Sequence, residues 1–342
     1  MPDGIFSCVM SCRKYIIILC ALLAAACSSR RGRFRVEGHF LHINQGQLLV
    51  YSTDGALGGV DTIKVSGGRF AYEIPCGKPG TLMFVFPNYS VHPVFAEPGG
   101  SVDINADASH LKEMEVTGTK QNELMTDFRM QTAQMSPPEI VRQAELFVGD
   151  HPESLVAEYL LRRYLVVTDK PEYDKALQLL GKMMAKQPDN GRLVRLKNDI
   201  RLMRNTMTGM AMPSFSAQAT DGRRVGGSEL RGHVTVIVAC AAWQYDSVDQ
   251  LRQLERKMKE QGSDFKVVAV CLDADSKQLE REMGDGTMPW PVVCDGKMFE
   301  GRLVAQLGLY TVPGNIIFNR QGRVVERNLE TQELLKRIDE IK

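Results

Sequence analysis

The chain has 342 residues, of which 44% are hydrophobic and 24% are charged. This is ordinary globular composition, and at roughly 100 to 200 residues per domain the length predicts two or three domains. Lysine and arginine number 42 against 41 aspartate and glutamate, so the chain has no overall basic charge of the kind that draws a protein onto nucleic acid, and a nucleic-acid partner is not indicated.

The N-terminal segment has the layout of an export signal. Arg13 and Lys14 precede an apolar run from Tyr15 to Ala26 that ends in small residues. The run is shorter than the roughly 20 residues that a membrane-spanning helix needs, so we expect a signal peptide over residues 1–26 and no transmembrane anchor in the mature protein. Translation can start at Met1 or at Met10.

The run LAAAC at positions 23–27 resembles a bacterial lipobox. The resemblance implies cleavage before Cys27 and a lipid on its thiol, whereas the alternative is a plain secretory signal with an unrelated cysteine. Several acyl chains on one residue hold a protein stably on a membrane. Residues 27–33 would then be a short basic tether. Because Ser28 follows the cysteine, the resemblance implies an outer-membrane lipoprotein of the cell envelope that faces the periplasm.

Residues 34–118 alternate apolar and polar side chains in short runs broken by Gly, Pro and Asn, a pattern typical of β-strands. Ser66-Gly67-Gly68 predicts a hairpin, because glycine supplies the positive φ that tight turns need. Short strands in this number predict a small β-sandwich. The expected strands are 33–40, 47–52, 60–65, 69–74, 81–86, 91–96 and 101–105.

The same stretch resembles an uncharacterised N-terminal domain found in lipoproteins of Gram-negative anaerobes. The resemblance has no known chemistry to transfer, and the residues that carry it are Phe34–Gly38, Asp61–Ile63, Gly68–Phe70 and Glu97–Gly99.

Residues 119–206 change to a helical period. A helix is predicted to start near Ser154, a second to cover Pro171–Lys186 and a third to cover Arg192–Met203. A tetratricopeptide-like unit is the alternative, but a stable stack needs at least three repeats and no period is visible. We therefore expect a helical linker region.

Residues 212–342 predict an α/β domain. A buried strand at His233–Cys240, a helix at Ser247–Gln261 and a strand at Lys266–Leu272 make a βαβ unit. Together with the entry Met212–Phe215 and Val312-Pro313 before another apolar strand, this order resembles the thioredoxin-like fold of the TlpA and ResA type, which are membrane-linked thiol-disulfide oxidoreductases. The expected fold class is thus α+β multidomain, with a β-sandwich, a helical linker and a thioredoxin-like domain.

The family's Trp-Cys-x-x-Cys motif is replaced here by the run Trp243-Gln244-Tyr245-Asp246-Ser247. The chemistry needs a thiolate at a helix N-terminus, and neither Gln244 nor Ser247 can form a disulfide. We expect Asp246 and Ser247 to cap the helix. The resemblance also implies a cis peptide bond at Val312-Pro313, facing a degenerate active site beside Trp243.

The remaining cysteines offer an alternative. Cys240 and Cys271 stand in apolar strands, where burial raises a thiol pKa. Cys294 precedes a turn predicted at Asp295-Gly296 and is the candidate reactive thiol. No catalytic residue and no cofactor are expected. A metal site is not expected either, because the histidines show no HxH or HxxxH spacing and His39 with His42 suit structural roles.

Three functions stay open on the sequence. The first is a binding or scaffold protein with a redox-inactive thioredoxin-like domain that holds an extended peptide or an envelope protein. The second is a thiol-disulfide oxidoreductase that uses Cys294 with Cys271 or Cys240. The third is a lipoprotein partner of an outer-membrane import or assembly system. In each case the membrane contact would be made through lipidated Cys27.

Overall fold

The computed structural model describes residues 32–168, 170–261, 265–284 and 288–341. The expected signal peptide, Cys27 and most of the tether lie outside these residues. Contacts divide the chain into two compact units. The first comprises the described residues up to Val50 with Thr62–Met130, and the second comprises Tyr51–Asp61 with the described chain from Gln131 onward. Within the described part of the chain, no helix is both long and apolar enough to cross a membrane.

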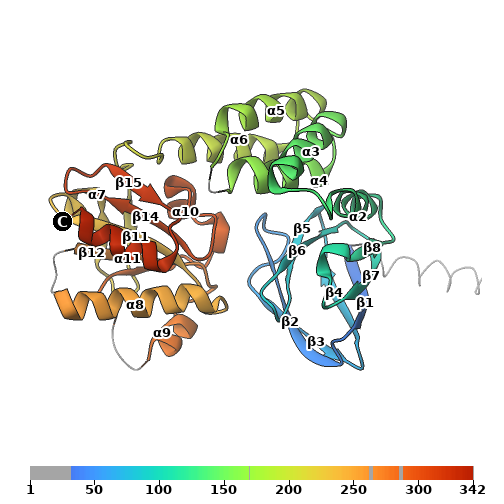
Figure 1. The fold of residues 1–342 in the computed structure, drawn as a ribbon, viewed down its shortest axis with the longest axis horizontal. Coiled ribbons are helices and arrows are strands. Elements are labelled where there is room, and N and C mark those ends of the chain that lie inside the picture. The colour runs from blue at the N-terminus through green and yellow to red at the C-terminus, as the bar shows by residue number, and fades with distance from the viewer. Residues whose placement is uncertain (1–31, 169, 262–264, 285–287, 342) are drawn as a thin grey trace, which may run out of the picture. The chain divides into compact units, whose positions relative to one another are not determined.

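The N-terminal β-rich domain is confirmed, and its hydrogen bonds join eight strands of the described chain in one sheet (Figure 1). The sequence predicts a β-sandwich. Strand β1 pairs with β4 on one side and, in parallel, with β7 on the other, and the strand order runs continuously as β6-β5-β2-β3-β4-β1-β7-β8. The strands are β1 (Arg33–Leu41), β2 (Gln45–Ser52), β3 (Asp61–Ser66), β4 (Arg69–Pro75), β5 (Gly80–Val85), β6 (Val91–Ala96), β7 (Ser101–Asp107) and β8 (Glu115–Thr117), with a 3-10 turn η1 (Leu111–Glu113) before β8.

Burial follows the alternation that predicted the strands. In β7 the side chains of Val102, Ile104 and Ala106 are buried between exposed neighbours. The predicted hairpin is also confirmed, because Gly67 and Gly68 join β3 to β4 with φ values of 58° and 72°. These angles suit the two-residue turn that matches the twist of paired strands.

Helix α2 (Lys120–Thr132) makes hydrogen bonds to the edge strand of this sheet. Asn122 is buried, accepts the backbone N–H of Phe95 at 2.9 Å and donates to the carbonyl of Phe95 at 2.8 Å. Phe95 lies in β6, the edge strand, whose outward backbone groups would otherwise lack partners. The amide of Asn122 therefore takes the place of a neighbouring strand at this position.

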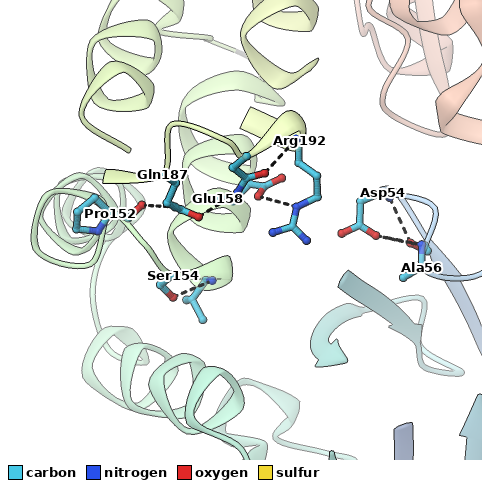
Figure 2. Close-up of polar contacts among 10 residues, drawn as sticks. Asp54, Ala56, Pro152, Ser154, Glu158, Gln187 and Arg192 are labelled. Atoms are coloured by element: carbon cyan, nitrogen blue, oxygen red, sulfur yellow. Dashed lines mark hydrogen bonds and ion pairs between the residues drawn. The ribbon is translucent and has the colours of Figure 1, made fainter. Parts of the chain in front are cut away.

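The helical region contains α3 (Pro137–Asp150), α4 (Leu155–Leu161), a π-helical turn η2 (Arg162–Val166), α5 (Tyr173–Lys186) and α6 (Gly191–Arg204). The predicted start near Ser154 is confirmed, because its hydroxyl accepts the N–H of Val156 at 3.1 Å (Figure 2). Asn190 caps α6 in the same way, with its side-chain oxygen 3.0 Å from the N–H of Arg192. Each cap satisfies a donor that the helix start leaves unpaired.

Two polar contacts tie these helices together (Figure 2). The side-chain amide of Gln187 donates to the carbonyl of Pro152 at 2.8 Å, and Arg192 lies 3.5 Å from the carboxylate of Glu158. Burial raises the pKa of Glu158, while the nearby arginine charge opposes that shift. The helices thus form one packed layer in the second unit.

The C-terminal α/β domain has a five-stranded sheet in the order β13-β12-β11-β14-β15 (Figure 1). Strands β11, β12 and β13 are parallel, whereas β14 and β15 are antiparallel to their neighbours. The strands are β11 (Val234–Cys240), β12 (Phe265–Cys271), β13 (Val292–Val293), β14 (Gly314–Phe318) and β15 (Val324–Arg327), and a separate pair is formed by β9 (Ser216–Gln218) and β10 (Arg224–Gly226).

Helices cover this sheet because its central strand is apolar on both faces. All of β11 is buried, and Val248 and Leu251 of α8 pack on one face of it together with Leu334 and Ile338 of α11. The helices are α7 (Gly227–Leu230), α8 (Tyr245–Gln261), α9 (Lys277–Met283), α10 (Arg302–Leu307) and α11 (Thr331–Glu340), with a 3-10 turn η3 (Met298–Glu300). This packing holds the carboxyl end of β11, where the candidate site begins.

Candidate functional site

The candidate site is the turn that leads from β11 into α8. The backbone N–H of Gln244 donates to the carbonyl of Ala241 at 3.1 Å, and α8 begins at the next residue, Tyr245. This start is two residues earlier than the sequence predicts. The turn therefore places Gln244 immediately before the first helical residue.

Gln244 caps the helix, which corrects the expectation that Asp246 and Ser247 do so. The side-chain oxygen of Gln244 accepts the N–H of Ser247 at 3.1 Å. Asp246 is exposed and contacts only the far end of the Gln244 amide, at 3.4 Å. The sequence-based expectation failed because it assumed that the usual short capping residues act, whereas the turn brings a longer side chain to the same backbone donor.

Ser247 is fully buried and braces the turn from inside. Its hydroxyl accepts the N–H of Ala241 at 3.0 Å and lies 2.9 Å and 2.8 Å from the carbonyl oxygens of Ala241 and Gln244. A hydroxyl has one proton, so the two carbonyl oxygens share it as acceptors, while the hydroxyl oxygen accepts from Ala241. Ser247 consequently has a structural role in the turn.

Trp243 is half-buried and stacks on an aromatic ring from a distant part of the sequence. The ring centroids of Tyr51 and Trp243 lie 4.9 Å apart with 30° between the planes, and Tyr51 also stacks on Phe299 at 5.8 Å. Burial raises the pKa of Tyr51. The indole N–H of Trp243 is buried and has no hydrogen-bond partner among the described residues.

Tyr51 begins the segment Tyr51–Asp61, which belongs to the second unit. The hydroxyl of Ser52 accepts the N–H of Ala56 at 3.0 Å and donates to Asp54 at 2.7 Å, which folds the segment into a tight turn (Figure 2). A side chain at Gly55 would meet the carboxylate of Glu300 at 2.8 Å, so the backbone approaches closely here. Sequence reasoning did not find this contact, because nothing local links residue 51 to residue 243.

Val312 and Pro313 lie beside the end of β11. Gly314, the first residue of β14, pairs with Ala239, and the Val312–Pro313 peptide bond is cis, as the resemblance implied. Both residues are half-buried. The structure therefore brings Trp243 and the Val312–Pro313 peptide to the same end of the sheet.

The cysteines of the α/β domain gather on one sheet face. Cys240 and Cys271 are register partners at the ends of β11 and β12, and both are buried as expected. Val270 pairs with Val293, so the next residue, Cys294, follows β13 beside Cys271. Burial raises the pKa of Cys240, and the hydrogen bond with Cys294 together with burial raises that of Cys271.

Asp273 lies against this group and is a polar residue that the sequence analysis did not single out. Its carboxylate accepts the N–H of Ala242 at 2.8 Å and the thiol of Cys271 at 3.3 Å. Burial raises the pKa of Asp273. A carboxylate two residues beyond a buried parallel strand is the signal that could have found it, because such strand ends converge at one edge of the sheet.

His39 and His42, for which the sequence analysis expects structural roles, both lie in or beside the β-rich sheet. His42 lies 2.8 Å from the carboxylate of Asp107, and no group of three or more potential metal ligands occurs among the residues that the structure describes. His39 pairs with Arg69 in the β1–β4 ladder.

Comparison with known families places both ends of the described chain. Residues 34–125 match DUF4369, a domain of unknown function, and residues 207–340 match the Redoxin family. The C-terminal α/β domain is thioredoxin-like and is similar to the Redoxin family over these residues. No curated protein matches the chain.

Three solved structures of thioredoxin-like proteins are each similar to about two fifths of this chain. The C-terminal domain of a proposed thiol-disulfide oxidoreductase from Bacteroides thetaiotaomicron has 26% identity and covers 40% of this chain and 97% of its own, with a TM-score of 0.36. A thiol-disulfide oxidoreductase from Bacteroides fragilis has 23% identity over 39% of this chain and 99% of its own, with a TM-score of 0.34. A proposed thiol:disulfide interchange protein DsbE from Chlorobium tepidum has 23% identity over 40% and 97%, also with a TM-score of 0.34.

Proposed function

We propose that this protein is an exported, lipid-anchored protein of the cell envelope whose thioredoxin-like domain binds a partner and does not exchange disulfides at the turn before α8. One observation carries the proposal. Gln244 is a helix cap and Ser247 is a buried brace, so the positions that would hold the two thiols hold structural groups. An amide and a hydroxyl cannot form or resolve a disulfide.

The stacking of Trp243 supports a docking role for the same surface. Tyr51 lies flat against Trp243, and such aromatic pairs contribute about 0.5–1.5 kcal/mol beyond their buried area. The buried indole N–H, which lacks a partner among the described residues, can donate one further hydrogen bond. We infer that the surface takes a peptide segment of an envelope protein that presents an aromatic side chain, and that Tyr51 is the internal occupant of this surface.

The envelope location rests on the sequence up to residue 33. The run ending at Cys27 resembles a lipobox, and arginines at positions 30, 31 and 33 suit a tether close to anionic lipid. The serine after Cys27 favours the outer membrane by the family's sorting rules. A lipid-anchored binding domain would thereby be held close to partners in the same membrane.

The docking role can be tested by tryptophan fluorescence of the full chain. The chain has two tryptophans, so the difference in emission between the unaltered chain and Trp243→Phe isolates Trp243. We expect Tyr51→Leu to change this difference spectrum and a free peptide of sequence 51–61 to reverse the change saturably. Tyr89→Leu, which alters an exposed tyrosine, is the matched control and should leave the spectrum unchanged.

The proposal also predicts which peptide fails. The same peptide with serine in place of its tyrosine should not restore the spectrum, because it cannot stack on the indole. If Tyr51→Leu leaves the Trp243 emission unaltered, or if both peptides act equally, the aromatic docking surface does not exist.

A further inference from the structure

Three cysteines stand side by side at the carboxyl ends of three neighbouring parallel strands. Cys240 pairs with Cys271 in register, and Cys294 follows the residue that pairs with Val270. All three side chains belong to, or pack against, the same hydrophobic cluster under α8 and α11. Because adjacent strands are about 4.8 Å apart, thiols on one face of neighbouring strands lie within reach of each other.

Cys271 and Cys294 are the pair that shares a polar neighbour. Both sulfurs contact Asp273. The sulfur of Cys271 lies 3.3 Å from the Asp273 carboxylate, and the sulfur of Cys294 lies 3.5 Å from the Asp273 carbonyl oxygen. Disulfides need Cα atoms about 4.4–6.8 Å apart, which is the spacing of neighbours across two adjacent strands.

Cys294 also has an approach for a ligand. It is half-buried and lines a cavity of 500 Å³ together with Asp295, residues 216–220 and Arg302 of α10. Pockets for small molecules are typically about 300–1,000 Å³. Cys240 and Cys271 are buried, so Cys294 is the thiol of this group that a reagent in the cavity can reach.

We propose that Cys271 and Cys294 are a redox-active dithiol, separate from the turn before α8, which closes to an intramolecular disulfide on reaction with a small disulfide bound in this cavity. Cys294 is the attacking thiol, Cys271 is the resolving thiol and Asp273 is the proton acceptor. The neighbouring Cys271 side chain lowers the pKa of Cys294, which favours the thiolate that exchange requires.

The exchange balances in two steps. The Cys294 thiolate, whose proton has gone to solvent, attacks one sulfur of the external disulfide; the reagent's S–S bond breaks and one thiolate leaves. Cys271 then gives its proton to the Asp273 carboxylate, and its sulfur attacks the Cys294 sulfur of the mixed disulfide. The second thiolate leaves, so two electrons pass from the protein dithiol to the reagent, which ends as two thiols.

The strand order distinguishes this pair from the other pairing open on the sequence. Strand β12 lies between β11 and β13, so Cys240 and Cys294 are separated by the strand that carries Cys271. Cys240 and Cys271 are neighbours, but neither has the access of Cys294, and the thiol of Cys240 points to the carbonyl of Val270 at 3.6 Å. Cys240 is therefore a matched control for the proposed pair.

The test is disulfide mapping on the full chain, purified in detergent, reduced and then incubated with oxidised glutathione. Free thiols are alkylated, the protein is digested, and linked peptides are identified by mass spectrometry. We expect a Cys271–Cys294 linked peptide in the unaltered chain and in Cys240→Ser. Cys271→Ser should instead accumulate a glutathione mixed disulfide on Cys294, and Cys294→Ser should leave Cys271 as a free thiol.

Asp273→Asn tests the resolving step separately. It removes the proton acceptor but preserves the shape of the side chain, so the mixed disulfide on Cys294 should persist and ring closure should slow. Circular dichroism of each variant establishes that it is folded; if a variant does not fold, the unaltered chain and Cys240→Ser still decide the pairing.

Two results would overturn the proposal: free Cys271 and Cys294 thiols in the folded, unaltered chain after incubation, or a linked peptide that joins Cys240 to Cys271. Neither result affects the docking proposal, because Trp243 and Tyr51 take no part in this exchange. Conversely, a failed docking experiment would leave this pair untouched.

Discussion

The structural role of Ser247 can be tested by removing its hydroxyl. In Ser247→Ala the N–H of Ala241 loses its acceptor, and the carbonyl oxygens of Ala241 and Gln244 lose a donor. Both Ala241 and Ser247 are buried, so water cannot replace these contacts without entering the core. The substitution leaves the side-chain cap of Gln244 in place, since that cap uses the backbone N–H of residue 247.

The magnitude follows from the orphaned donor. A buried polar group left unpaired costs about 1–3 kcal/mol, and alanine recovers roughly 0.5 kcal/mol through its better helix propensity. We therefore expect Ser247→Ala to lower the free energy of unfolding of the thioredoxin-like domain by about 0.5–2.5 kcal/mol. A change of this size is a large fraction of the stability of an ordinary domain.

Urea unfolding followed by tryptophan fluorescence measures this change. Both tryptophans, Trp243 and Trp290, lie in the thioredoxin-like domain, so the signal follows its unfolding. Asp246→Ala in the same turn is the matched control and should stay within about 0.5 kcal/mol, because Asp246 is exposed. If both variants have the same midpoint and slope, the hydroxyl of Ser247 does not brace the turn and the structural interpretation is refuted.

Three further predictions concern the rest of the chain. The double variant Gln244→Cys with Ser247→Cys should form an intramolecular disulfide and gain weak reductase activity, because the two positions are three residues apart at a helix start. Counting free thiols and a turnover assay with a disulfide substrate would check this. A folded double variant that cannot form the disulfide would contradict the turn geometry. Cys27→Ser should accumulate as uncut precursor or appear in the soluble fraction, and normal processing with retention on membranes would contradict the lipid anchor. Burial, aided by the charge of Arg129, lowers the pKa of His92 from 6.5 to about 4, so its stabilising contribution is complete above pH 6.5 and is lost as the pH falls toward 4. Between pH 7 and pH 5 the β-rich domain should lose about 2 kcal/mol, measured by hydrogen exchange of β5 and β6, and His92→Gln should remove this dependence.

The sequence by itself determined most of the elements and the absence of a CxxC motif from the α/β domain. Alternation placed strands β1 to β7 within a few residues but did not predict β8. The glycines at positions 67 and 68 located a hairpin, because both signals are local properties of the backbone. The replacement of both motif cysteines by Gln244 and Ser247 was equally plain, since a thiol is either present or absent. Burial of Cys240 and Cys271 also followed from the apolar strands around them.

Tertiary structure decided what these residues contact. Alternation assigns side chains to two faces of a strand but carries no information on which strands pair, so the single eight-stranded sheet could not be told from a sandwich.

The stacking of Tyr51 on Trp243 and the alignment of Cys271 with Cys294 join residues far apart in the chain, and such contacts depend on strand order and register. The cap at α8 likewise depends on where the turn places the Gln244 side chain, and capping preferences based on residue type alone do not predict that position.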